Sequence, residues 1–227
     1  MSDGQARAHQ RRRRSGGVVR YGLAGLVGAV LVGCAGSGFQ YVSNPDLGVF
    51  FKLPAQWTVM DEDDLSGREG SPPRRAFGSD GRDSVWLVVF DAAPKPSLEH
   101  FLDEDSTHPA GLAQARLLEP DERDRFSLAS LRNEIIPLDD LAESSQDFRP
   151  LRQEEIELPD GTHGHRGVYL LSTRDGGSYT YDQTALVDAT VRTAYVLAIG
   201  CGVDCYERHR DLIDAVVSSW TIKEQRP

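Results

Sequence analysis

The chain has 227 residues, with 25 lysines and arginines against 35 aspartates and glutamates, and a formal charge of −10. Residues 1–33 hold six of the basic residues and one of the acidic ones, which leaves −15 on the remainder. Nucleic acids and bacterial membrane surfaces are both anionic, so they should repel this remainder. The charge therefore argues against a nucleic-acid-binding protein, and no nucleic acid is expected as a partner.

The first 33 residues have the organisation of a secretory signal peptide. Basic residues at Arg11 to Arg14 and Arg20 precede an uncharged run from Tyr21 to Val32. A run of about a dozen residues is typical of the apolar region of a signal peptide. A transmembrane helix needs roughly 20 apolar residues, so this run is too short for a permanent span.

The run ends in Leu31-Val32-Gly33-Cys34, which resembles the lipobox of bacterial lipoproteins. The resemblance implies a diacylglyceryl thioether (palmitate-type acylation) on Cys34, cleavage before it, and Cys34 as the mature N-terminus. Two acyl chains hold a protein stably on a bilayer, whereas one is marginal. The expected location is the extracytoplasmic face of the bacterial cell membrane, with the membrane as partner through this lipid. The alternative is an ordinary signal peptide with a chance cysteine.

Three segments follow from this reading. Residues 1–33 are the expected signal peptide, 34–47 a lipidated tether of small and polar residues, and 48–227 a single domain. Residues 34–227 are enough for one ordinary domain or two very small ones, and 39% apolar residues permit a real core.

The first half of the domain predicts strands and one short helix. Strands are expected where apolar and β-branched residues run together, at 48–54, 57–60, 84–90 and 112–118. The run at 84–90 is apolar on both faces, which is typical of a central strand. Ser97 is a good N-cap for a helix over 98–102.

The middle of the chain is ambiguous. Leu128, Leu131 and Ile135 fall at helical spacing, and Asp121-Glu122 suit a helix N-terminus. Pro137 would end such a helix, and a polar loop is expected over 143–147.

The last third predicts an antiparallel meander, since short strand patterns alternate with turn residues. Its strands are expected at 151–158, 167–172, 179–187 and 192–199. An amphipathic helix with Leu212, Ile213, Val216 and Val217 on its apolar face follows, and Trp220-Thr221-Ile222 is expected to form a terminal strand.

Apart from Cys34, the chain has one pair of cysteines, Cys201 and Cys205. In an oxidising compartment a lone pair indicates a structural disulfide. Gly202 permits the tight turn that a spacing of four requires. Free thiols and a redox or metal role are the alternatives, although redox motifs usually keep two residues between the cysteines.

Several of these features together resemble the PsbP/Mog1-like fold, which actinobacterial LpqN-type lipoproteins share. They are a first strand that ends in Leu-Pro and is followed by x-x-Trp (Leu53-Pro54-Ala55-Gln56-Trp57), a helix opened by Pro96-Ser97, the meander, and a final helix ending in Ser218-Ser219-Trp220. The resemblance spans about Gly48 to Lys223 and implies an α/β (α+β) sandwich, in which helices pack on the faces of an antiparallel sheet. It also implies adaptor or accessory roles, and it carries over no functional residue.

The residues that could carry chemistry form weak patterns. His163 and His165 could share one strand face of a metal site, but a third ligand is missing, and exposed hairpin histidines are expected. Asp61 to Asp64 lack the spacing of a calcium loop and are expected to be a solvated loop. Tyr179, Tyr181 and Trp86 could line a binding face, although aromatic residues in strands usually pack across strands.

No nucleophile elbow, phosphate-binding loop, dinucleotide fingerprint or zinc-protease motif occurs. The sequence therefore predicts no catalytic residues, no metal and no cofactor. The expected function is a non-catalytic adaptor that binds an extracytoplasmic protein partner. A carrier of a lipid or small molecule is the alternative, which an apolar pocket would favour; a hydrolase with scattered catalytic residues is a third.

Overall fold

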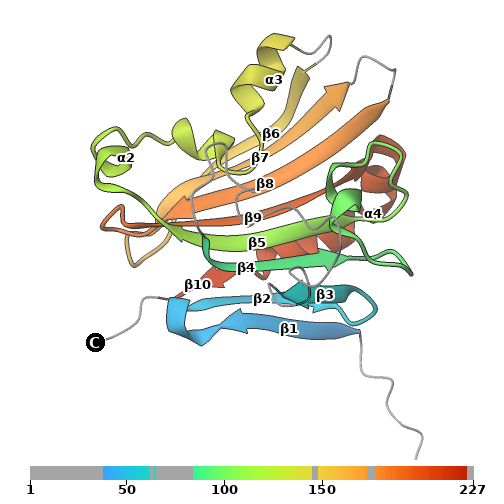
Figure 1. Cartoon of the computed structure of the whole chain (residues 1–227), viewed down its shortest axis with the longest axis horizontal. Helices are drawn as coiled ribbons and strands as arrows, with labels where there is room; N and C mark the ends of the chain where they lie inside the picture. The colour runs from blue at the N-terminus through green and yellow to red at the C-terminus, as the bar shows by residue number, and fades with distance from the viewer. Residues whose placement is uncertain (1–37, 62–63, 65–83, 145–147, 173–176, 224–227) are drawn as a thin grey trace, which may run out of the picture. The chain divides into compact units, whose positions relative to one another are not determined.

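The computed structural model describes residues 38–61, 64, 84–144, 148–172 and 177–223. These residues belong to one compact unit, and the predicted signal peptide and Cys34 lie outside them. Two antiparallel sheets dominate the unit, with strand orders β3-β4-β5-β9-β8-β7-β6 and β1-β2-β10 (Figure 1). Among the described helices, none is both long enough and apolar enough to cross a bilayer.

The predicted strands of the domain are confirmed, with shifts of a few residues at their ends. The bounds in the larger sheet are β3 Thr58–Asp61, β4 Ser84–Asp91, β5 Ala110–Leu117, β6 Phe148–Glu157, β7 His163–Ser172, β8 Ser178–Val187 and β9 Thr193–Gly202. In the smaller sheet they are β1 Phe39–Asn44, β2 Val49–Pro54 and β10 Thr221–Ile222. The meander runs from β6 to β9, each strand pairing antiparallel with the next.

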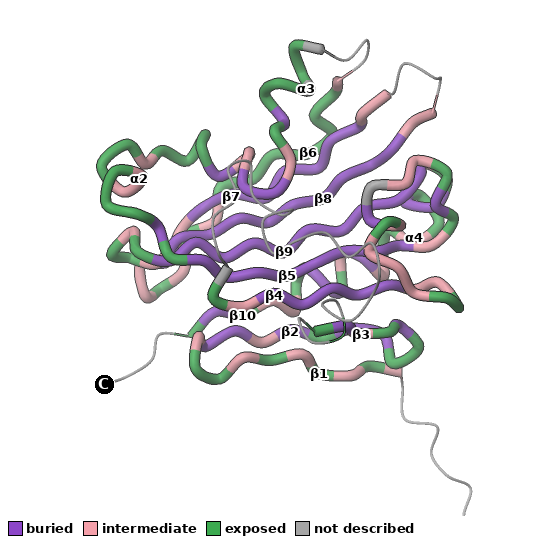
Figure 2. Tube along the Cα trace, viewed as in Figure 1, coloured by how far each residue is buried: buried purple, intermediate pink, exposed green. Residues whose placement is uncertain are grey.

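Each face of the seven-stranded sheet has its own hydrophobic core. On one face, Phe90 and Ile199 pack with Phe51 of β2 and Ile213 of α4 (Val203–Ser218). On the other face, Leu112 packs with residues of η3 (Leu98–Leu102), η4 (Ser130–Asn133) and α3 (Leu138–Ser144). Figure 2 shows buried residues along most of β5, β9 and β8, as expected for strands covered on both faces.

The helix after Ser97 is confirmed, since the Ser97 side chain accepts a hydrogen bond from the Glu99 N–H at 3.2 Å, but it is a 3₁₀ helix. The long helix expected before Pro137 is wrong. Residues 120–144 form α2 (Pro120–Asp124), η4 and α3, and Leu128 is 36% exposed. The polar loop expected at 143–147 is partly wrong as well: α3 extends to Ser144, and 145–147 lie outside the described residues.

The N-terminal boundary of the domain also needs correction. Residues 39–44 were expected to belong to the tether, yet they form β1 and pair with β2 along its whole length. The 3₁₀ helix η1 (Pro45–Leu47) then links the two strands, and its C-cap Gly48 has a φ of +67°. A Cβ at Gly48 would lie 1.9 Å from the Lys223 carbonyl oxygen, so glycine is needed where the chain's last described residue meets β2.

Cys201 is the last residue but one of β9 and Cys205 lies in the first turn of α4, and the two form a disulfide with a Cα–Cα distance of 5.9 Å. Mass spectrometry of the exported protein without reductant should therefore give a mass two hydrogens below the dithiol value. Closing so short a loop should stabilise the fold by about 2 kcal/mol. Two cysteines that alkylate freely in the unreduced protein would contradict the pairing.

Candidate functional site

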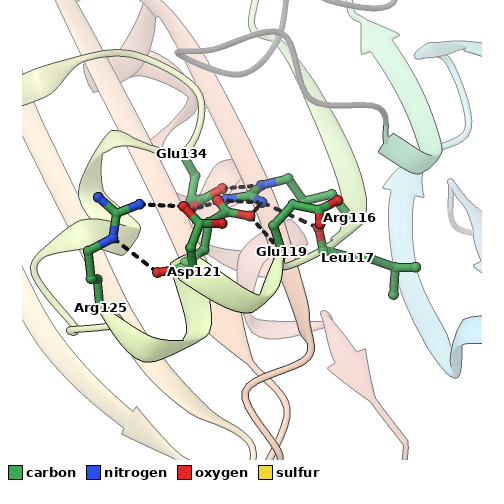
Figure 3. A network of polar contacts seen from close by, with 7 residues as sticks. Arg116, Leu117, Glu119, Asp121, Arg125 and Glu134 are labelled. Atoms are coloured by element: carbon green, nitrogen blue, oxygen red, sulfur yellow. Dashed lines mark hydrogen bonds and ion pairs between the residues drawn. The ribbon is translucent and has the colours of Figure 1, made fainter.

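A buried arginine near the end of β5 forms the floor of a cleft. Arg116 is 4% exposed and donates to both carboxylate oxygens of Glu134, from Nε at 2.7 Å and from a terminal nitrogen at 2.9 Å (Figure 3). Its other terminal nitrogen donates to Glu122 at 3.1 Å. Burying a guanidinium group costs free energy unless the charge is paired, so both carboxylates are needed beside Arg116. Because Glu122 and Glu134 belong to the segment after β5, these contacts hold that segment on the sheet.

Helix α2 brings Glu122 to this floor. Glu119 precedes the helix in an extended conformation and Pro120 occupies the first turn, where a missing N–H costs nothing. The Glu119 N–H donates to the Glu122 carboxylate at 2.7 Å. One carboxylate therefore ties the start of the helix to the buried arginine.

The cleft has a volume of about 470 Å³. Its lining residues are Arg116, Leu118, Glu119, Asp121, Glu122, Arg125, Phe126, Ser130, Asn133 and Glu134. Four carboxylates and two guanidinium groups give this lining a formal charge of −2. The rim is exposed: the Asp121 and Arg125 side chains are 70% and 76% accessible and form an ion pair at 2.5 Å.

The lining of the cleft is mainly ionic and offers few side chains of the nucleophilic kinds. No histidine or cysteine occurs among its described lining residues. The one hydroxyl among these lining residues, that of Ser130, donates to the Ser127 carbonyl at 2.6 Å. Within the described ranges, no group of three or more histidine, cysteine, aspartate or glutamate side chains could hold a metal ion.

A second buried network joins the meander to α4. Arg166 on β7 donates to Asp182 on β8 at 3.0 and 2.6 Å and to Asp214 on α4 at 2.5 Å. The Tyr206 hydroxyl donates to Asp182 at 2.8 Å, and burial, reinforced by the charge of Asp182, raises the pKa of Tyr206. Burial opposes the charge on Arg166, but hydrogen bonds to Asp182 and Asp214 outweigh it and raise the pKa of Arg166. The charges and hydrogen-bonding groups of this network are paired with one another. We therefore interpret it as a part of the fold and not as a ligand site.

The structure places the two hairpin histidines on β7, and the expectation that both are exposed is wrong. His163 is half-buried, whereas His165 is 9% exposed and contacts the Tyr169 hydroxyl at 3.2 Å. The strand begins four residues earlier than predicted, so His165 lies among the core residues of the covered face.

His165 should make the stability pH-dependent. Burial, with the nearby positive charge of Arg132, lowers the pKa of His165. Below about pH 6.5 the unfolded chain binds a proton at this histidine that the folded chain does not. The free energy of unfolding should therefore fall as the pH drops below that value, by at most about 1.4 kcal/mol per pH unit from this group. Urea titrations at several pH values measure how the free energy of unfolding changes with pH. This pH dependence should be weaker in the His165→Gln variant, and an unchanged pH dependence would contradict the role of His165.

The other residues singled out in the sequence do not meet at the cleft. Cys201 and Cys205 are buried at α4, and Cys34 lies outside the described residues. Tyr179 and Tyr181 are 4% and 0% exposed and belong to the core. Trp86 is only half-buried and packs at the edge of the other core. These aromatic residues therefore pack the sheet and form no open binding face.

The acidic run after β3 is described only in part. Asp61 and Asp64 accept each other's backbone N–H, at 3.1 and 3.3 Å, while Glu62 and Asp63 lie outside the described residues. The residues that form the cleft, above all Arg116 and Glu134, were not anticipated. The sequence held one signal for the cleft. Arg116 lies on the same face of β5 as Leu112 and Gln114, in a strand that is almost entirely buried, where a charged side chain needs a partner.

Neither a model of a protein family nor a curated protein matches the chain. Among solved structures, the cyanobacterial PsbP protein of Synechocystis is 16% identical, with a TM-score of 0.51, over 84% of this chain and 96% of that one. LpqN of Mycobacterium tuberculosis, described as involved in cell envelope biogenesis, is 13% identical over 82% and 91% of the two chains, with a TM-score of 0.48. The similarity to the cyanobacterial protein, together with the strand order above, shows that the chain has a PsbP/Mog1-like α+β fold.

Proposed function

We propose that the protein is a non-catalytic binding module, anchored by its lipid at the extracytoplasmic face of the membrane, that holds a cationic segment of a partner protein in the acidic cleft. The observation that carries this proposal is the division of charges in the cleft. The floor charges are paired with one another and are buried or, in Glu122, only slightly exposed, whereas the rim carboxylates, Glu119 and Asp121, are exposed.

A lysine or arginine side chain fits this arrangement. The formal charge of the lining is negative, and Leu118 and Phe126 offer apolar surface for the alkyl part of such a side chain. The face of Phe126 can also attract a cation. The Asp121–Arg125 pair is exposed and hence contributes little stability, so a partner's guanidinium group can replace Arg125 at small cost.

The lipid carrier is less well supported by the described clefts. A carrier site should be mainly apolar, with a few polar groups that orient the ligand. The cleft at α2 has only Leu118 and Phe126 as large apolar lining residues. A second cleft, of about 310 Å³, combines the carboxylates of Asp46, Asp160 and Asp188 with apolar side chains, among them Leu47, Tyr195 and Ile222.

Cross-linking in intact cells tests the proposal, with the anchored protein as bait and mass spectrometry of the captured species. We expect one dominant protein partner, whose yield falls at least about tenfold when Asp121→Lys reverses the rim charge, equivalent to about 1.4 kcal/mol. Glu207→Lys is the matched control, because Glu207 forms a similar helical ion pair with Arg210 and is 53% exposed, on α4.

Capture of a protein partner that is equally strong in the Asp121→Lys variant would overturn the assignment of the cleft. A lipid or metabolite that co-purifies without any protein partner would instead indicate that the protein is a carrier of that ligand.

A further inference from the structure

The outward face of the three-stranded sheet combines aromatic and lysine side chains. We call it the aromatic–lysine face, and its residues are Phe39, Tyr41, Phe50, Lys52 and Lys223. Phe39 is 45% and Tyr41 76% exposed, which is unusual for large aromatic side chains in a folded domain. Tyr41 lies opposite Lys52 in the β1–β2 pairing.

The lysines of this face are arranged over its aromatic rings. The Lys52 ammonium group lies 5.6 Å from the centre of the Tyr41 ring, and that of Lys223 lies 5.3 Å from the centre of the Phe50 ring. A hydrogen bond from the Lys223 N–H to the Gly48 carbonyl, at 2.9 Å, holds the end of β10 in this position. Both ammonium groups are therefore presented on the same side as the exposed aromatic rings.

The charge of this face contrasts with the rest of the chain. The sequence contains three lysines, Lys52, Lys95 and Lys223, and two of them lie here, although residues 34–227 carry a formal charge of −15. Lysine is attracted to anionic phospholipid headgroups, by roughly fivefold in the binding constant for each residue near the surface. Aromatic side chains concentrate at the level of the headgroups, where their ring and polar tip meet different surroundings.

The position of the aromatic–lysine face in the sequence also points to a phospholipid surface. Phe39, its first residue, comes five positions after Cys34. Five residues span at most about 18 Å. With Cys34 lipidated, the beginning of β1 cannot move farther than this from the bilayer.

We propose that the aromatic–lysine face rests on the anionic headgroups of the membrane, an inference that depends on the proposed lipid anchor. The lysines contact lipid phosphates and the aromatic rings enter the headgroup layer. The residues of β2 and those of η4 and α3 pack on opposite faces of the seven-stranded sheet, and β1 and α2 lie at opposite sides in Figure 1. The acidic cleft, whose lining includes residues of η4, would consequently lie on the face of the seven-stranded sheet that is farther from the membrane.

The three lysines provide the test. Residues 34–227, which include the whole compact unit, can be coupled through the Cys34 thiol to a maleimide lipid in vesicles, so the test does not need enzymatic lipidation. In phosphatidylglycerol vesicles, an amine-reactive reagent should label Lys52 and Lys223 at least about fivefold more slowly, relative to Lys95, than in solution. Phosphatidylcholine vesicles should give much weaker protection.

Equal labelling of all three lysines in anionic vesicles would overturn the proposal, as would selective protection of Lys95. Protection of Lys52 and Lys223 that occurs without vesicles and grows with protein concentration would assign the face to a second copy of the chain instead. Fatty-acid labelling of Cys34 in cells is measured separately. A failure of the anchor is thus distinguishable from a failure of the orientation.

Discussion

Replacing Asp182 with alanine should lower the free energy of unfolding by about 3–5 kcal/mol. Asp182 is 0% exposed and accepts hydrogen bonds from Arg166 and Tyr206. Without it, Arg166 keeps a charge at 4% exposure with Asp214 as its remaining ion-pair partner among the described residues, and the Tyr206 hydroxyl loses its acceptor. A buried charge left without its main partner is among the most destabilising changes that a single substitution can cause.

Urea denaturation followed by circular dichroism measures this loss. Asp214→Ala is the matched control, because Asp214 contacts the same guanidinium group but its side chain is 38% exposed. That variant should lose about 1 kcal/mol or less, since an accessible ion pair contributes little. Similar losses in the two variants would mean that Asp182 is not the centre of the network.

The Cys34→Ser variant should incorporate no labelled fatty acid and should leave the membrane fraction entirely. A serine hydroxyl cannot form the thioether on which the proposed anchor depends. Residues 34–227 carry a formal charge of −15, and two lysines alone give only weak adsorption to a bilayer. Metabolic labelling and fractionation of cells that express the variant provide both measurements.

The double variant Cys201→Ala/Cys205→Ala is the control, since it removes cysteines without touching Cys34. It should keep both the label and the membrane location. If Cys34→Ser still takes up fatty acid, the anchor has been assigned to the wrong residue.

The C-terminal meander could be predicted from sequence because its signals are local. Turn residues such as Pro159-Asp160-Gly161 separate runs whose side chains alternate, and neighbouring strands in sequence become neighbours in the sheet. The pattern failed at the start of β7, where His165 was taken for a hairpin residue. A histidine is compatible with both an exposed turn and a buried strand. Its burial here depends on the contact with Tyr169, which the local sequence does not show.

Strand β1 was not predicted because its aromatic side chains are on the outward face, where a strand usually has polar ones. Phe39 and Tyr41 point outward, while Gln40 lies between them and donates its amide to the carbonyls of Pro54 and Trp57. Local hydrophobicity therefore predicts the wrong face, and the strand is specified by its partner β2.

The cleft could not be predicted because its contacts are not local. Glu122 and Glu134 lie six and eighteen positions after Arg116, and nothing in that spacing indicates that they share it. The same contacts explain the failed helix over 120–136. Both ends of the segment are fixed to β5 by charge, which a continuous helix through Leu128 and Leu131 would not allow.

The early start of β1 also sets how strongly the cleft needs to bind. Since the strand begins five residues after Cys34, an anchored domain is confined to a thin layer above the bilayer. A partner embedded in the same membrane meets it at an effective concentration in the millimolar range. An intrinsic dissociation constant of about 0.1 mM would then keep the cleft largely occupied, while the complex still exchanges rapidly. The short linker would thus add to the selection made by the charges of the cleft, because it favours partners that lie close to the membrane.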